Sequence, residues 1–252
     1  MITLLFKIEW QYHTGQLSFY ILSTFFLLLG FHMSSTGNLG ASELIKTNAP
    51  YQISFFIGVF SLASVFAIMF FCIQAMVRDR QYHTEGIIYS TAVQKLSLYW
   101  SRFLGAFIIS LFVYSLMLIG FALGTFFSED PYGIASFNFL HYLHVWSTII
   151  LPNIFILTVL LFCFATLSRK TLIVYIGAVF IYALYFGAAI FLNSPMLAQA
   201  VPPSPKNMII AAIVDPFGLS AFFEHTMYWT PFQKNNQLVS FSGYFLLNRI
   251  IW

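Results

Sequence analysis

The sequence predicts an all-α fold, a polytopic transmembrane helix bundle with about five spans and a cytoplasmic N-terminus. Only 8% of the 252 residues are charged and 60% are hydrophobic, whereas soluble domains carry roughly a quarter of their residues as charged side chains. A charge at the centre of a bilayer costs about 2.5–3.5 kcal/mol, so spans should be runs without charge. Such runs cover 10–42, 47–77, 103–128, 131–168 and 171–205. Each is longer than the roughly 20 residues that a crossing helix needs.

The distribution of charges orients the five spans, which we place near 17–33, 54–77, 103–127, 145–168 and 171–193. Short loops with Lys and Arg beside the spans mark the cytoplasmic side of a membrane protein. With the N-terminus inside, that side holds Lys7, Arg78, Arg80, Lys95, Arg102, Arg169 and Lys170. The 128–144 loop on the other side has no Lys or Arg. The charges therefore predict a cytoplasmic N-terminus.

The two ends of the chain have patterns of their own. Residues 1–16 alternate apolar side chains with Lys7, Glu9 and Gln11, which favours a short helix in the membrane interface; a frayed N-terminal turn is the alternative. Residues 194–252 contain several prolines that break helices, and we expect them to form a mixed outer-face segment. Its last residues resemble the first turns of another span. Residues 1–252 are thus expected to be one transmembrane domain, incomplete at its C-terminus.

The loop 78–102 is the only substantial cytoplasmic loop that this topology predicts. It holds six of the nineteen charged residues, namely Arg78, Asp79, Arg80, Glu85, Lys95 and Arg102. Its apolar residues, among them Ile87, Leu96 and Trp100, are more numerous than solvation requires. We interpret the loop as a surface that faces a partner. The alternative is a solvated loop that only follows the positive-inside rule.

Small residues four positions apart occur in two of the predicted spans. Gly120 and Gly124 in the third span, and Ala183 and Gly187 in the fifth, have the spacing that lets two helix backbones approach closely. Such spacings also arise by chance in apolar sequence. In the fourth span, Pro152 lacks a backbone donor and crowds the carbonyl four residues before it, so a kink is expected there.

The sequence contains no motif for catalysis or for cofactor binding. Neither GxxxxGK[ST] nor GxGxxG is present, and Glu224 is not part of an HExxH. His141 and His144 could form a metal site with Glu129 and Asp130, but only two imidazoles are supplied and a turn separates them from the carboxylates. Without a run of basic residues, no electrostatic surface for nucleic acid exists. We therefore expect no catalytic residue, no cofactor, no metal and no nucleic acid.

A series of short motifs leads from the second span to the third: Arg78-Asp79, Glu85-Gly86, Tyr89-Ser90-Thr91, Lys95 and Tyr99-Trp100-Ser101-Arg102. Their order resembles the cytoplasmic coupling segment of permeases of the ABC type-2 (ABC-2) exporter class, in which an acidic residue followed by glycine opens the loop. The segment from Phe6 to Tyr12 looks like the interfacial helix of the same class.

The tail carries three further motifs, Asp215-Pro-Phe-Gly218, Tyr228-Trp229-Thr230-Pro231 and Asn248-Arg249. They look like the outer segment before the last helix in bacterial ABC permeases that contain a second permease half and end in a metallo-aminopeptidase domain. The resemblance covers nearly all of the chain. A six-span permease unit would need one more helix after Trp252. No peptidase domain is present, so a peptidase role would not concern these residues.

The resemblance implies the transmembrane permease subunit of an ATP-driven exporter in the cell (inner) membrane. Its partners would be an ABC ATPase subunit and a second permease half, supplied by a homodimer or by the same longer chain, within the lipid bilayer. The ATPase would dock on Arg78, Asp79, Arg80, Glu85, Gly86, Lys95 and Arg102. Two alternatives remain: a non-transporting membrane scaffold or anchor for a partner enzyme, and a membrane enzyme that acts through His141, His144 or Glu224.

Overall fold

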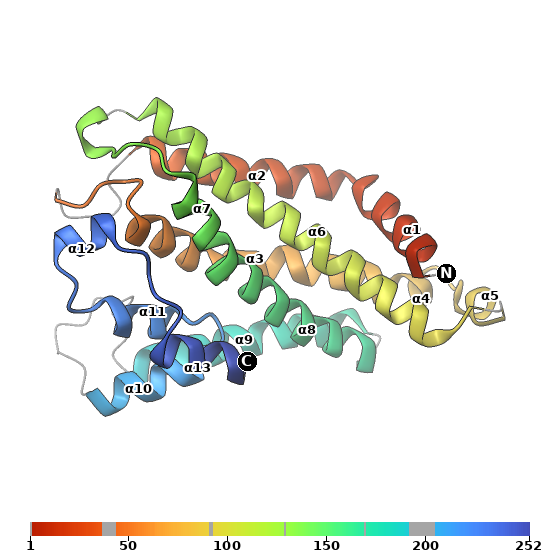
Figure 1. Ribbon diagram of the computed structural model, residues 1–252. Helices are drawn as coiled ribbons and strands as arrows, with labels where there is room; N and C mark the ends of the chain where they lie inside the picture. The colour runs from red at the N-terminus through yellow and green to blue at the C-terminus, as the bar shows by residue number, and fades with distance from the viewer. Residues whose placement is uncertain (1, 37–43, 91–92, 129, 169, 192–204) are drawn as a thin grey trace.

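The computed structural model describes residues 2–36, 44–90, 93–128, 130–168, 170–191 and 205–252, and all regular structure among them is helical. The long helices α2 (Leu17–Ser35), α3 (Pro50–Met76), α6 (Lys95–Gly124), α8 (Leu151–Ser168) and α9 (Thr171–Phe191) form an elongated bundle (Figure 1). The all-α prediction is therefore confirmed.

Four helical stretches are long and apolar enough to cross a membrane by length and composition: Leu17–Ser35, Pro50–Met76, Lys95–Phe127 and Phe139–Ser168. They correspond to the first four predicted spans. The fifth predicted span is α9, whose described apolar part, Thr171–Gly187, is shorter. At 1.5 Å per residue its 17 residues cover about 26 Å, slightly less than a typical hydrocarbon core of about 30 Å.

The segment 78–102 is largely helical. Two short helices, α4 (Arg78–Gln81) and α5 (Glu85–Ser90), follow α3 directly, and α6 begins at Lys95, eight residues before the predicted start of the third span at 103. Gln94 is extended, with φ −65° and ψ 127°, and supplies the N-cap of α6. The predicted loop is thus a helical connection at one end of the bundle (Figure 1).

The kink expected at Pro152 takes the form of a wider helical turn. Helix α7 (Phe139–Val145) continues through the π-helical turn Trp146–Ile150 into α8 without a break. The backbone N–H of Leu151 donates to the carbonyl of Trp146, five residues earlier. One extra residue in the turn accommodates the missing donor of Pro152 while the helix remains long enough to span.

Shorter helices cover both ends of the bundle. At one end α1 (Ile2–Thr14) packs against α6 beside α4 and α5. Near the other end lie the 3₁₀ turns Thr125–Phe127 and Pro131–Gly133 and the tail helices α10 (Pro205–Val214), α11 (Leu219–Thr226), α12 (Pro231–Asn236) and α13 (Gly243–Ile251). The apolar run 209–214, too short to cross, belongs to α10, which packs against α9, α11 and α13.

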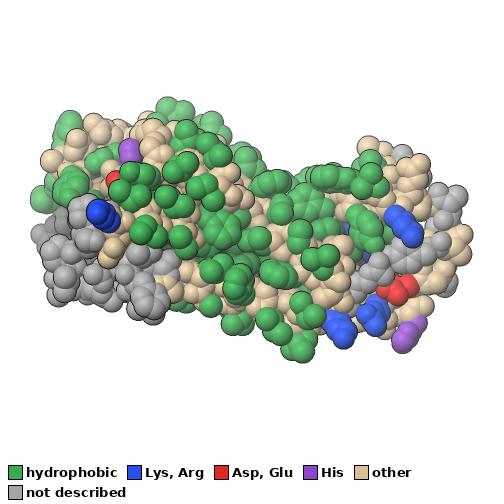
Figure 2. All heavy atoms as spheres, turned by 90° about the horizontal axis from the view of Figure 1, so that it is seen from below, with side chains coloured by type: hydrophobic (Ala, Val, Ile, Leu, Met, Phe, Trp, Pro, Cys, Tyr) green, Lys and Arg blue, Asp and Glu red, His purple; other side chains and the backbone are tan. Residues whose placement is uncertain are grey.

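The surface of the bundle is apolar along its middle. Figure 2 shows hydrophobic side chains across this part of one face, with Lys and Arg side chains toward the two ends. Large apolar side chains are exposed on α2, α6 and α9, for example Phe25 at 51%, Phe112 at 46% and Val179 at 66%. An apolar middle between charged ends is the surface that a bilayer solvates.

Candidate functional site

A buried cluster of charges joins α1 to the bundle. Glu9 of α1 accepts a hydrogen bond from Arg78, whose Nε lies 3.6 Å from Oδ1 of Asp79. Arg102 of α6 completes the cluster, with Nη2 2.5 Å from Asp79 Oδ2 and Nε 3.5 Å from Glu9 Oε1. The exposed fraction is 13% for the Arg78 side chain and 6% or less for the other three. We call these four residues the Glu9 cluster.

The Glu9 cluster is balanced, because two guanidinium groups face two carboxylates. Removing one member of a buried ion pair typically costs about 3–5 kcal/mol, since the partner charge is left uncompensated. Gly105 of α6 allows the close approach of α1: a Cβ at this position would lie 3.0 Å from Cβ of Glu9. The cluster therefore holds α1, α4 and α6 in one arrangement.

His13 lies one turn beyond Glu9 on the same face of α1. Its side chain is fully buried and Nε2 lies 4.0 Å from Oε2 of Glu9. Burial lowers the pKa of His13 to about 4, and the nearby Arg78 acts in the same direction. The Arg78 guanidinium in turn stacks over the ring of Tyr12, 4.2 Å from its centroid. His13 is thus a neutral residue of the interior at pH 7.

The residues predicted to dock a partner divide into two groups. Arg78, Asp79 and Arg102 are paired within the chain in the Glu9 cluster, so their charges are already balanced there, and a direct contact with a partner stays a prediction. The packing of α1 against α6 is the reason, since it buries Asp79 and Arg102 and leaves Arg78 only slightly exposed. The others lie on the end of the bundle: Arg80, Gly86 and Lys95 are exposed and Glu85 is half-buried.

The small residues of α6 pack against α2. A Cβ at Gly120 would lie 2.0 Å from the carbonyl oxygen of Leu27, and one at Gly124 would lie 2.1 Å from Oγ of Ser34. On α2, Gly30 mirrors them: a Cβ there would lie 2.0 Å from the carbonyl oxygen of Met117. The two backbones therefore touch, as expected for small residues four positions apart.

The second small-residue pair, in α9, does not line a contact within this chain. Ala183 is exposed, and a Cβ at Gly187 would have nothing within 4 Å. The contact of α9 with α8 uses a different glycine: a Cβ at Gly177 would lie 2.5 Å from the ring of Phe164. The face of α9 that carries Ala183 and Gly187 makes no close helix contact within the described part of this chain, so their role in packing stays a prediction.

Two of the three tail motifs, Asp215-Pro-Phe-Gly218 and Asn248-Arg249, lie more than thirty positions apart in the sequence but meet in one buried network. Asp215 accepts hydrogen bonds from the backbone N–H groups of Phe217 (2.8 Å) and Ser220 (2.7 Å). Asn248 of α13 donates to the carbonyl of Asp215 at 2.8 Å, and Arg249 donates to that of Phe217 at 2.9 Å. Burial raises the pKa of Asp215, and it lowers that of Arg249 to about 10. The network holds α10, α11 and α13 together.

A polar contact lies deep in the bundle and has no counterpart in the sequence analysis. Asn153, one residue after Pro152, is fully buried and donates to Oγ of Ser61 at 3.1 Å. Tyr114 of α6 donates to the carbonyl of Ile57 in the same part of α3. Asn beside Pro in an apolar run is the signal that could have indicated this contact. Its members are neutral, so it supplies helix contacts rather than a charged site.

The histidines considered as metal ligands make other contacts. His141 Nε2 lies 3.2 Å from the side-chain amide of Asn138, and His144 Nε2 lies 2.8 Å from the carbonyl oxygen of Val239. Among the described residues, no group of three or more His, Cys, Asp or Glu side chains could hold a metal ion. Glu129 lies outside the described residues, and Glu224 is half-buried in α11.

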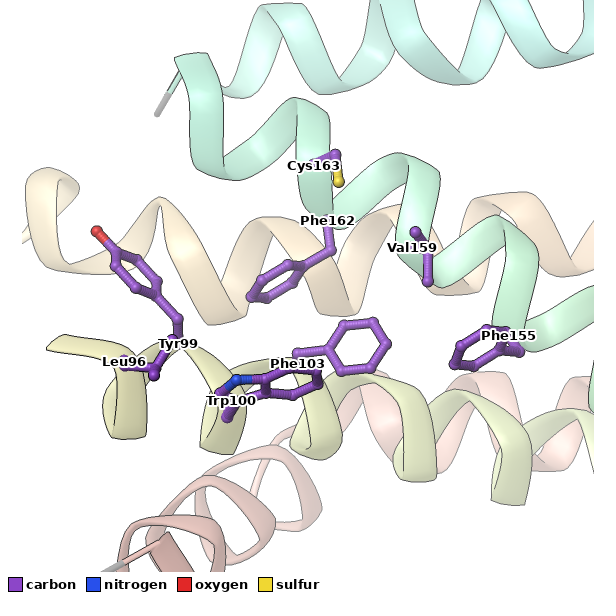
Figure 3. Close-up of a pocket in the computed structure, with 8 residues that line it drawn as sticks. All are labelled: Leu96, Tyr99, Trp100, Phe103, Phe155, Val159, Phe162 and Cys163. Carbon is purple, nitrogen blue, oxygen red and sulfur yellow. The ribbon is translucent and has the colours of Figure 1, made fainter. Parts of the chain in front are cut away.

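Two apolar grooves lie along α6. The first, of about 370 Å³, lies between α6 and α8 and is lined by Leu96, Tyr99, Trp100, Phe103, Phe155, Val159, Phe162 and Cys163 (Figure 3). The second, of about 500 Å³, lies between the far half of α6 and the segment 137–146, and its lining includes Phe126, Phe139 and Trp146. Both have the size of ligand pockets, which are about 300–1,000 Å³.

Comparison with protein-family models, with curated proteins and with solved structures gives no match for this chain. The class of protein is therefore inferred from the sequence and structure of this chain alone. The described chain is a helical bundle in which four stretches are long and apolar enough to cross a membrane, as in a multi-pass membrane protein.

Proposed function

We propose that this chain is the transmembrane permease subunit of an ATP-driven ABC-2 exporter in the cell (inner) membrane. A single arrangement supports the proposal. Helices α4 and α5 and the start of α6 lie at the extreme end of the bundle (Figure 1) and present Arg80, Gly86 and Lys95 outward. Directly behind them, the Glu9 cluster ties α4 to α1 and α6. A partner that moves the exposed helices would therefore move the long helices as well.

In the proposed mechanism, movement of the ATPase is passed through α4 and α5 to the long helices. A separate ABC ATPase binds the exposed end and hydrolyses ATP, while this chain contributes no catalytic group. The buried ion pairs resist separation because each unpaired charge would remain out of water. Displacement of α4 and α5 consequently passes to α3 and α6 as rigid bodies. A second permease half, from a homodimer or from the same longer chain, completes the path for the substrate.

Affinity purification of the tagged native protein from membranes tests the proposal. We expect an ABC ATPase to co-purify with the wild-type chain and to be lost from the variant Arg80→Glu, Lys95→Glu, which reverses two exposed charges. The matched control is Lys206→Glu, an exposed lysine at the start of α10 near the other end of the bundle. Both variants should retain the thermal stability of the wild type in detergent.

Two results would contradict the proposal. The first is that no ATPase accompanies the wild-type chain under mild detergent conditions, which would favour a non-transporting scaffold or an anchor for a partner enzyme. The second is that the ATPase stays bound to the Arg80→Glu, Lys95→Glu variant as tightly as to the Lys206→Glu control. In that case the exposed end formed by α4 and α5 is not the docking surface.

A further inference from the structure

The groove between α6 and α8 opens to the side of the bundle. Its floor is aromatic: the ring of Phe103 lies 5.5 Å from that of Phe162 and 6.2 Å from that of Phe155, between centroids. Its rims are exposed, with Leu96 at 69% and Trp100 at 51%. Figure 3 shows these side chains facing one another across the space between the two helices. Both helices belong to stretches that can cross a membrane, so the groove faces acyl chains rather than water.

An apolar groove alone gives little affinity for lipid, because lipid tails are as apolar as the groove. Binding must come from close packing against the aromatic floor and from charge where the groove ends. Leu96 lines that end, and its neighbour Lys95 is exposed. Lys170, two residues after the end of α8, is exposed as well. Two lysines at the ends of the helices that form the groove favour an anionic headgroup there.

The second groove provides an internal contrast. Its lining includes Phe126, close in sequence to the exposed Asp130, and no Lys or Arg occurs in the described part of 126–146. It is apolar and of similar size, but the charges near it have both signs, because Nζ of the exposed Lys46 lies 3.5 Å from the carbonyl oxygen of Ile134. Selection of an anionic headgroup is therefore expected to be stronger at the α6–α8 groove, where two lysines lie, than at the second groove, where Asp130 offsets Lys46.

We propose that the α6–α8 groove holds one acyl chain of an anionic phospholipid, whose phosphate lies beside Lys95 and Lys170. The inference rests on the chain being embedded in a membrane, but not on transport or on an ATPase. The acyl chain fills the groove between α6 and α8, whose contact there consists of the aromatic pairs of Phe103 with Phe155 and Phe162. It is thus expected to remain with the protein through purification.

Native mass spectrometry of the detergent-purified protein tests the proposal, with phosphatidylglycerol and phosphatidylcholine added in equal amounts. We expect one retained phosphatidylglycerol per chain in the wild type and its loss in Val159→Trp, which fills the groove. The matched control is Val179→Trp, the same substitution on the exposed face of α9. Equal retention of phosphatidylglycerol in the two variants, or of both lipids in the wild type, would overturn the proposal.

The two lysines are tested separately. Lys95→Gln and Lys170→Gln should each lower the preference for phosphatidylglycerol over phosphatidylcholine about five-fold, from the contribution of one lysine near an anionic surface. Lys206→Gln should leave the preference unchanged. An unaltered preference in the Lys95→Gln, Lys170→Gln double variant would show that the headgroup does not lie at this end of the groove and would overturn the proposal.

Fluorescence gives a readout that needs no substitution filling the groove. Trp100 lines it, so the emission difference between the wild type and Trp100→Phe isolates this residue in vesicles that contain brominated lipid. We expect half-maximal quenching at a several-fold lower mole fraction of brominated phosphatidylglycerol than of brominated phosphatidylcholine. Equal mole fractions would refute the proposal. So would conversion of a wild-type dimer to a monomer by Val159→Trp, which would assign the groove to a second copy.

Discussion

Glu9 and His13 lie four residues apart on α1, and both side chains point into the bundle. The alternation of residues 1–16 predicts a helix but places Glu9 among the polar side chains of its outer face. The structure instead pairs it with Arg78 and Arg102, which come from α4, just after the end of α3, and from α6. At the scale of single residues, partners distant in the sequence decide whether a charge is buried.

Replacing Glu9 by Gln tests the Glu9 cluster. The substitution leaves two guanidinium groups with one carboxylate in a buried site, so we expect a loss of about 3 kcal/mol, near the lower end of the range for a broken buried pair because Arg78 is partly exposed. Unfolding of the detergent-solubilised protein measures it. Lys7→Gln, which removes an exposed charge two positions away, should change stability by less than about 0.5 kcal/mol. A similar effect of both substitutions would show that the cluster adds no stability.

His13 should make the docking of α1 dependent on pH. Its pKa is about 4 in the folded chain and about 6.5 when exposed. Between these values the unfolded state binds a proton that the folded state does not. The contribution is therefore fully present above pH 6.5 and is lost as the pH falls to 4, by up to about 3 kcal/mol.

The measurement is unfolding of the wild type and of His13→Asn at a series of pH values. Their difference isolates the histidine, because asparagine does not titrate, and Glu9 and Arg78 remain in both proteins. A difference that stays constant from pH 7 to pH 4 would contradict the assignment of His13 as a buried neutral residue.

At the scale of helices, glycine residues allow the backbones of α2 and α6 to touch. Gly120 and Gly124 were predicted to allow a close approach, but the sequence does not say to which helix. Gly30 and Ser34 of the first span have the same spacing and both face α6. That shared spacing is the signal that could have identified α2 as the partner.

The alanine substitutions Gly120→Ala and Gly187→Ala should have opposite effects. At Gly120 the added methyl group would lie 2.0 Å from a backbone oxygen, so the helices must separate, at a cost of about 1–3 kcal/mol. At Gly187 it would meet nothing within 4 Å, and alanine should stabilise α9 by roughly 0.5–1 kcal/mol. Thermal unfolding in one detergent compares the two. Destabilisation by both would mean that the outward face of α9 has a partner.

In residues 205–252, too, the sequence pattern predicts a helix but not the segment against which it packs. Its last residues look like the beginning of a further span, and the structure confirms a helix there, α13. What the pattern does not reveal is that Asn248 and Arg249 turn toward α10 and bind carbonyl groups around Asp215. Hydrogen bonds between segments more than thirty positions apart leave no periodic trace in either segment.

For the whole molecule, the predicted topology has a direct test. In a variant without Cys72 and Cys163, single cysteines at Lys7 and Arg80 should react with a membrane-impermeant maleimide only from the cytoplasmic side. A cysteine at Lys206 should react only from the other side, because the described helices place an odd number of crossings between Arg80 and Lys206 if α6, α8 and α9 all span. Labelling of Arg80→Cys and Lys206→Cys from the same side would contradict five spans with a cytoplasmic N-terminus.

The sequence by itself determined that the chain is helical and where the long helices lie. Their approximate positions follow from charge-free runs, because an isolated charge in hydrocarbon is costly whatever its neighbours are, but their exact limits do not, since α6 begins at Lys95 and contains Arg102. It did not determine which small residues touch, which charges are buried or where grooves open. Those depend on pairs of side chains from different helices: Glu9 with Arg78, Gly120 with Leu27, and Phe103 with Phe162. Only the packing of the bundle brings such pairs together, since helix periodicity sets the faces of each helix and not their partners.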